Sequence, residues 1–256
     1  MKTEYFVEKG SIVREIWGKS DTILLIFAGA AAEFALNKAV DWLYFTGKLP
    51  KDPIGRLFST VTYARKIVFS KENAALQAID NINAIHAAVE SKRGKSIPDW
   101  AYRDVLFMLI DYSIRSFEVL ERKLTNSEKE EVFTIFRRVG ARMNLKDLPF
   151  TYDSFLVMRK QHLEQHLAFG KYSKDLFLQY RKHLGILRYR LLLEIQILVV
   201  PKEVQRLLSL RKTSAMKSVI PLYKIGRSIK FDRLLKLLIL PSEYKEEIQS
   251  LDHIPT

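Results

Sequence analysis

The sequence predicts an all-α fold built as a single globular domain. Apolar residues recur with a period of about 3.6 residues almost throughout the chain, which indicates helices that turn one face toward a core. Alternating apolar and polar runs bounded by Gly or Asn turns, which would indicate strands, are scarce. With 256 residues and a hydrophobic content of 48%, the chain can bury a sizeable core.

The chain carries no internal repeat, low-complexity tract or Gly/Ser-rich linker. We therefore expect one helical domain over residues 1–210, followed by a basic, helical C-terminal extension over residues 211–256. The periodic segments predict helices at residues 10–17, 21–45, 53–69, 71–92, 98–122, 126–144, 151–167, 173–183, 187–198, 201–210 and 228–239.

Several of these helices have recognisable ends. Ser70 is the expected N-cap of the helix over 71–92, and Asn126 or Ser127 is expected to open the helix over 126–144, with acidic residues in its first turn. Pro149, in the segment "LKDLPF", predicts a break. Glycines mark three expected helix ends, at Gly94, Gly140 and Gly185.

The most apolar window of the chain is "ILLIFAGAAAEFAL" at residues 23–36. It is too short to span a bilayer and contains Glu33, so we interpret it as a buried helix. The N-terminal segment mixes acidic and basic residues without an apolar run, unlike a secretory signal. These features predict a cytoplasmic protein.

The chain contains no cysteine. This excludes disulfides, zinc–cysteine sites, iron–sulfur clusters, thiolate-ligated haem and covalently attached c-type haem. Any metal ion must therefore be bound by His, Asp, Glu or Tyr. The sequence also lacks a Gly-rich phosphate loop, a zincin motif and a serine–histidine–acid order.

The net charge of +13 is concentrated toward the C-terminus, where residues 201–240 contain ten Lys or Arg against Glu203 and Asp232. This excess of positive charge suits binding to an anionic membrane surface or, less favoured, to nucleic acid. A basic face that is simply exposed to water is an equally weighted alternative. Within the helix expected at 228–239, one face is apolar and would suit a peripheral membrane contact. Packing of that face on the domain is the slightly favoured alternative; its residues are Phe231, Leu234, Leu235 and Leu238.

The stretch "AIDNINAIHAAVESKRG" at residues 78–94 places His86 in an apolar helical stripe with Ile79, Ile82 and Val89. A core face is an unusual position for a histidine. His86 is therefore either a buried histidine with a hydrogen-bond partner or a ligand for a group that is not protein.

A second pair of histidines lies in "HLEQH", where His162 and His166 are four residues apart on one helical face. This spacing suits two metal ligands, but we favour an exposed pair on a polar helix. His183 and His253 lie near expected helix ends without other candidate groups around them.

Arg56 and Thr60 form another candidate pair, in "DPIGRLFSTVTYARKIVF". Four residues apart on a helix, a guanidinium and a hydroxyl can converge on one anionic or oxygen-bearing group. The pair alone is weak evidence, because Arg and Thr one turn apart are common in helices.

A series of segments, in unbroken order over roughly residues 11–210, resembles a known family. The family is the oxygenase domain shared by the latex clearing protein, which is the bacterial rubber oxygenase, and the membrane-bound oxygenase of fungal mycophenolic acid synthesis. The resemblance rests on "SIVREIWG", "DPIGRLFSTVTYARKIVFSKENAALQAIDNINAIHAAV", "IPDWAYRDVLFMLIDYSIRSFEVLERKLTNSEKEEVFTIFRRVGARMNL" and "LPFTYDSF".

The resemblance implies a helical, globin-like core around haem b, with His86 as the axial ligand of the iron. It also implies that Arg56 and Thr60, which match the family's Arg-x-x-x-Thr motif, lie near the haem. Asp111, in "FMLIDYSIRSF", matches an acidic position of the family and is expected in the pocket or next to it.

The chain also departs from the family. Asn37 and Lys38 stand where many members carry His-Pro, and the catalytic carboxylate proposed for rubber oxygenases has no clear counterpart. Glu33 is a substitute by position only. Haem binding is thus better supported than rubber-type cleavage.

We therefore expect a haem-b-dependent oxygenase that uses dioxygen and acts on an apolar substrate of isoprenoid or lipid-like type. A haem-binding sensor or carrier without turnover is one alternative. A basic helical protein that binds an anionic membrane or nucleic acid is another.

Overall fold

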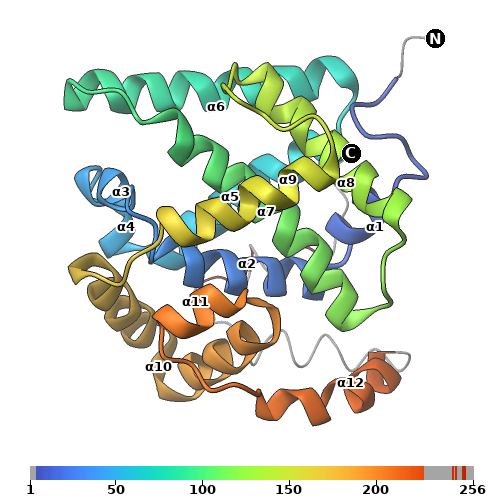
Figure 1. Ribbon diagram of the computed structural model, residues 1–256, viewed down its shortest axis with the longest axis vertical. Helices are drawn as coiled ribbons and strands as arrows, with labels where there is room; N and C mark the ends of the chain where they lie inside the picture. Colours follow the sequence, from blue (N-terminus) through green and yellow to red (C-terminus); the bar gives the residue numbers. More distant parts are fainter. Residues whose placement is uncertain (1–3, 228–243, 245, 247–249, 252–256) are drawn as a thin grey trace.

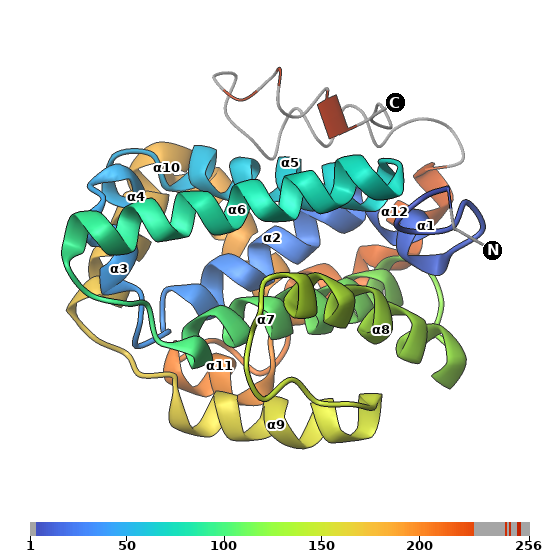
Figure 2. The same ribbon diagram turned by 90° about the horizontal axis from the view of Figure 1, so that it is seen from above.

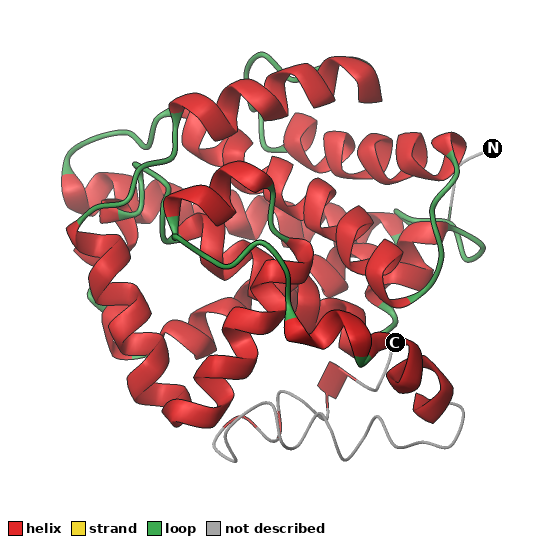
Figure 3. Cartoon of the chain, turned by 60° about the horizontal axis from the view of Figure 1, so that its bottom comes forward, coloured by secondary structure: helices red, strands yellow, loops and turns green. Residues whose placement is uncertain are grey.

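The computed structural model describes residues 4–227 together with residues 244, 246, 250 and 251, and in this part of the chain all regular structure is helical (Figures 1 and 3). The predicted all-α class is confirmed. The helices are α1 (Ile12–Trp17), α2 (Ser20–Phe34), α3 (Asp41–Phe45), α4 (Lys48–Lys51), α5 (Pro53–Phe69), α6 (Glu72–Arg93), α7 (Asp99–Leu120), α8 (Asn126–Arg142), α9 (Tyr152–Gln165), α10 (Lys171–Val199), α11 (Lys202–Leu207) and α12 (Ile220–Arg227), with a 3-10 turn at Ala215–Ser218.

Helix α2 lies at the centre of the molecule (Figure 2). Thirteen of its 15 residues are buried, as expected for a helix that is apolar on all sides. It packs against α7, α10 and α1, and α7 continues the core toward α8 and α9. Helices α5 and α6 pack on each other along one side of this core (Figure 2).

The helix expected over 21–45 is interrupted. Helix α2 ends at Phe34, and the chain then crosses beside the end of α9 before α3 begins at Asp41. The crossing is fixed by backbone hydrogen bonds from Lys38 N to the His166 carbonyl (2.9 Å) and from Ala168 N to the Leu36 carbonyl (2.8 Å). Because those groups bond across to α9, they are not available to continue the helix.

One expected N-cap is wrong, and one expected helix start is confirmed, since α8 begins at Asn126. Ser70 is the C-cap of α5, and the N-cap of α6 is Lys71, whose side chain makes no capping hydrogen bond. Helix α8 is capped by Thr125, which forms a reciprocal capping box with Glu128. The reciprocal hydrogen bonds between Thr125 and Glu128 thus make Thr125, the residue just before Asn126, the N-cap of α8.

The three expected glycine stops behave differently. Gly94 ends α6 in the left-handed conformation, with φ 68°, as predicted. Gly185 interrupts the helical geometry inside α10 with φ 72°, so the two expected helices form one kinked element. Gly140 lies inside α8, where a Cβ atom would stand 2.6 Å from Leu106 Cδ2, so this glycine allows close packing on α7.

The helix expected at 228–239, with its apolar face, lies outside the described residues. Nearby described residues contact the main body: Tyr223 donates to Asp21 Oδ2 (3.0 Å), and Lys224 donates to the Glu121 carbonyl (3.0 Å). Tyr244 donates to Asp52 Oδ1 (2.6 Å) and its ring stacks on Phe58. In the part of the chain that the structure describes, no helix is long and apolar enough to cross a membrane.

The contact between α2 and α7 provides a test of the packing. A Cβ atom on Gly29 would lie 2.4 Å from two ring carbons of Tyr112. We expect Gly29→Ala to destabilise the protein by about 1–3 kcal/mol through overpacking, despite the better helix propensity of Ala. Thermal unfolding followed by circular dichroism measures the loss. Gly10→Ala is the control, because its Cβ would meet nothing within 4 Å, and an equal shift in both variants would contradict the packing argument.

Candidate functional site

His86 lies on α6 beside the first turns of α7. Its Nδ1 is buried and has no hydrogen-bond partner in the described structure, while its ring packs against Tyr102 at a centroid distance of 4.9 Å. Burial lowers the pKa of His86 to about 4, and the positive charge of Arg56 lowers it in the same direction. The imidazole is therefore neutral at physiological pH and keeps an unused nitrogen.

The apolar face around His86 is only partly covered. Ile79 is fully buried, whereas Ile82, His86 and Val89 are half-buried, and Ile85 on the same helix is 46% exposed. Helix α6 thus begins as a packed core helix and continues as a helix whose apolar side chains remain accessible.

Arg56 and Thr60 lie together on α5, as the sequence predicts. Arg56 Nη1 donates to Ser59 Oγ (2.9 Å) and to Thr60 Oγ1 (3.2 Å). Burial lowers the pKa of Arg56, and its cation forms no ion pair with a carboxylate in the described part of the chain. The structure therefore brings an uncompensated guanidinium close enough to His86 to affect its pKa.

Asp111 belongs to a different group of side chains. Its Oδ1 accepts from Arg115 Nε (2.6 Å) and its Oδ2 from Arg159 Nε (3.0 Å). These contacts place it in a buried polar network between α2, α7 and α9, and its expected role in the haem pocket stays a prediction.

The centre of this network is Glu33, whose side chain is fully buried. Arg159 donates to both carboxylate oxygens (2.5 and 2.6 Å), and Tyr112 Oη donates to Oε2 (2.8 Å). Burial raises the pKa of Glu33, but the charge and hydrogen bonds of Arg159 and His162 outweigh it and lower the pKa to about 2. A carboxylate held by this many hydrogen bonds is a poor general base, and a catalytic role for Glu33 stays untested.

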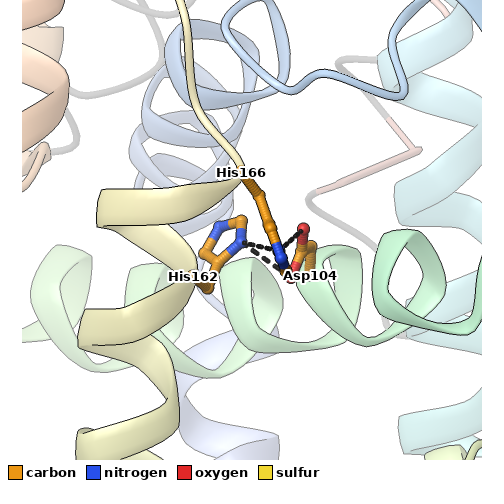
Figure 4. Close-up of side chains that lie close together, drawn as sticks. All are labelled: Asp104, His162 and His166. Carbon is orange, nitrogen blue, oxygen red and sulfur yellow. Dashed lines mark hydrogen bonds and ion pairs between the residues drawn. The ribbon is translucent and has the colours of Figure 1, made fainter.

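Glu33 is connected to a second carboxylate through histidine. His162 Nε2 lies 2.8 Å from Glu33 Oε1, and His162 Nδ1 lies 2.7 Å from Asp104 Oδ1. His166 Nδ1 lies 2.9 Å from Asp104 Oδ2, so one carboxylate faces both imidazoles (Figure 4). Burial opposes a charge on His162, but its hydrogen bonds to Asp104 and Glu33 raise its pKa.

The prediction of an exposed histidine pair is therefore wrong. The side chain of His162 is 2% exposed and that of His166 is 23% exposed. The sequence did contain a signal, because Phe155, Arg159, His162 and His166 follow one another at spacings of four, three and four and form the inward face of α9. Charged and polar side chains on a buried stripe need buried partners, and Glu33 and Asp104 provide them.

Helix α7 lies between the residues around His86 and the cluster of Asp104, His162 and His166. Tyr102 contacts His86, whereas Trp100 and Asp104 contact His166. Residues 100 and 104 share a helical face and residue 102 points to the opposite side. The His86 pocket and the Asp104 cluster are thus two distinct sites on opposite faces of α7.

The polar network around Glu33 depends on Arg159, which pairs with both Glu33 and Asp111. We expect Arg159→Met to cost about 3–5 kcal/mol, because two carboxylates lose their buried cation. The matched control is Arg142→Met, which removes an ion pair to Asp80 between exposed side chains and should leave the free energy of unfolding nearly unchanged. Urea unfolding of the three proteins gives this comparison, and equal midpoints for the two variants would refute it.

Comparison with known proteins places these sites in a family. The family model described as "ER-bound oxygenase mpaB/B'/Rubber oxygenase, catalytic domain" matches residues 17–230, a range that includes both sites. No curated protein and no solved structure matches the chain. The resemblance seen in the sequence is confirmed, and the chain belongs to the mpaB/rubber oxygenase catalytic-domain family.

Proposed function

We propose that this chain is a haem-b-dependent oxygenase in which His86 holds the iron, acting on an apolar substrate of isoprenoid or lipid-like type. The observation that carries the proposal is the buried, unpartnered Nδ1 of a neutral imidazole beside an unpaired guanidinium. A buried ring nitrogen without a hydrogen-bond partner costs free energy unless another group uses it.

The residues present fit the cofactor. A neutral imidazole is the form that binds haem iron, and the apolar residues of α6 beside His86 suit the face of a porphyrin. Arg56 would pair with a propionate or with dioxygen, and Thr60 would add a hydrogen bond. When bound, haem b supplies the redox chemistry with dioxygen, and the chain supplies ligation, orientation and exclusion of water.

An apolar substrate is supported by the surroundings of α5. Ile54 and Phe58 are two positions from Arg56 and therefore lie on the opposite face of α5. Together with Leu57 they line an apolar hollow shared with α2 and α10. Its other lining residues are Leu24, Phe27, Ala28, Ala31, Tyr180, Leu184, Arg188, Leu192 and Ile195. Apolar walls of this kind would hold a hydrocarbon chain.

The ligand assignment is tested by His86→Ala. We expect the variant to fold but to lose haem, because no nitrogen remains for the iron. Soret absorbance and a pyridine haemochrome assay of the purified or haem-reconstituted protein measure the bound cofactor. His183→Ala on α10 serves as the control and should retain haem. An unchanged Soret band in His86→Ala, or a wild-type protein that never binds haem, would refute the assignment.

The role of Arg56 is tested separately. We expect Arg56→Ala to keep most of its haem but to lower turnover by about 10²-fold, because a buried cation acts on charge that develops during the reaction. Oxygen consumption with an isoprenoid alkene measures turnover, and Arg56→Lys should restore part of it.

The control for Arg56 is Lys66→Ala, an exposed position on α5. Wild-type turnover and spectra in Arg56→Ala would contradict the role. Haem binding without oxygen consumption in the wild-type protein would indicate a haem carrier or sensor instead of an oxygenase.

A further inference from the structure

We propose that Asp104, His162 and His166 form a second metal site, which binds one divalent transition-metal ion between α7 and α9 (Figure 4). Each of the three side chains offers one ligand atom, and these atoms lie within 4.8 Å of one another. The site does not depend on the proposed haem function, because it lies on the opposite face of α7 from His86.

The spacing of the donors suits a metal ion. The Nδ1 atoms of His162 and His166 are 3.4 Å apart. Two imidazole nitrogens bound tetrahedrally at about 2.0–2.1 Å from one metal ion are separated by about 3.3 Å. Asp104 Oδ1 and Oδ2 lie 2.7 and 2.9 Å from these nitrogens, so the carboxylate needs to withdraw by only a few tenths of an ångström to become the third ligand.

The partners of the three ligands match those that orient metal-bound side chains. His162 Nε2 faces Glu33, and a ligating histidine commonly donates its second N–H to a carboxylate. Glu33 is itself fixed by Arg159 and Tyr112. Asn37 Nδ2 donates to Asp104 Oδ2 (3.3 Å), which helps to hold this carboxylate in place with its two oxygens facing His162 and His166.

His166 is positioned from outside the network, because its ring packs on Trp100 at a centroid distance of 4.4 Å. A hollow next to both histidines provides space for a further ligand, such as water or a small molecule. Arg103, Phe107, Met158, Gln161 and Gln165 line this hollow beside the three ligands. The site therefore has three protein ligands and an open position.

The donor set defines the class of ion. Two imidazoles and one carboxylate with an open position are the ligands of catalytic zinc sites and of non-haem Fe(II) sites. Mg²⁺ and Ca²⁺ prefer oxygen ligands and should bind poorly. We therefore expect Zn²⁺, Fe²⁺ or Co²⁺ to occupy the site.

The test uses the full chain, treated with a chelator and then titrated with Co²⁺, whose visible absorption reports nitrogen and oxygen ligands. We expect one equivalent to bind, with displacement by Zn²⁺ and no competition from Mg²⁺. His166→Gln should weaken binding by at least 100-fold, and this variant is the most conservative choice because His166 is the least buried ligand.

Two variants are matched controls. His183→Gln and His86→Ala should bind Co²⁺ as the wild-type protein does, and the second control separates this site from the haem pocket. If His166→Gln does not fold, the wild-type midpoint of thermal unfolding still provides a readout, because Zn²⁺ should raise it and Mg²⁺ should not. Absence of Co²⁺ binding to the wild-type chain, or unchanged binding in a folded His166→Gln protein, would overturn the proposal and leave a metal-free ion-pair network.

Discussion

The structure depends most on the neutralisation of one carboxylate, that of Glu33, inside the most buried helix. An ionised carboxylate removed from water is costly unless it is paired and hydrogen-bonded. Arg159, Tyr112 and His162 all bond to Glu33, and together they come from α7 and α9. Because each partner must reach the same two oxygens, the carboxylate fixes how these helices lie around α2.

This constraint extends outward through α7. Asp111 shares Arg159 with Glu33, and Asp104 shares His162 with it, so two further acidic residues of α7 are tied to α9. The crossing segment after α2 adds Asn37 to the same network through Asp104. Residues of α2, α7, α9 and the crossing segment thus form one polar layer within an otherwise apolar core.

On the opposite side of α7, the polar groups of His86 and Arg56 are not paired with carboxylates of described residues as those around Glu33 are paired with cations. Within the described structure, the buried Nδ1 atom of the half-buried His86 has no hydrogen-bond partner, and the guanidinium of Arg56 bonds only to the hydroxyls of Ser59 and Thr60. In the polar network of Glu33 every charge is matched, whereas around His86 a neutral nitrogen and a cation remain unmatched. This contrast distinguishes the ion pairs of Glu33 with Arg159, which support the fold, from the surroundings of His86, for which we propose a cofactor.

Periodicity determined much of the fold from the sequence. It predicted the all-α class, the buried helix around residues 23–36, and the helices that carry Arg56, Thr60 and His86, because one apolar face every 3.6 residues is a local property. The order of motifs in the same segments was sufficient to identify the family, which the match over residues 17–230 confirms. Helix ends were less reliable, because caps such as Thr125 are selected by hydrogen bonds of single side chains.

Only the tertiary structure decided how polar residues in these helices pair. The network joins three helices that are far apart in the sequence, through Glu33, Asp104, Arg159 and His162. No local sequence pattern predicts that these side chains contact one another. Spacing placed His162 and His166 on one face of α9 but did not say whether that face is turned to water or to α7. The fate of a charged side chain depends on the partner that another helix supplies, and that pairing is a property of the packed molecule alone.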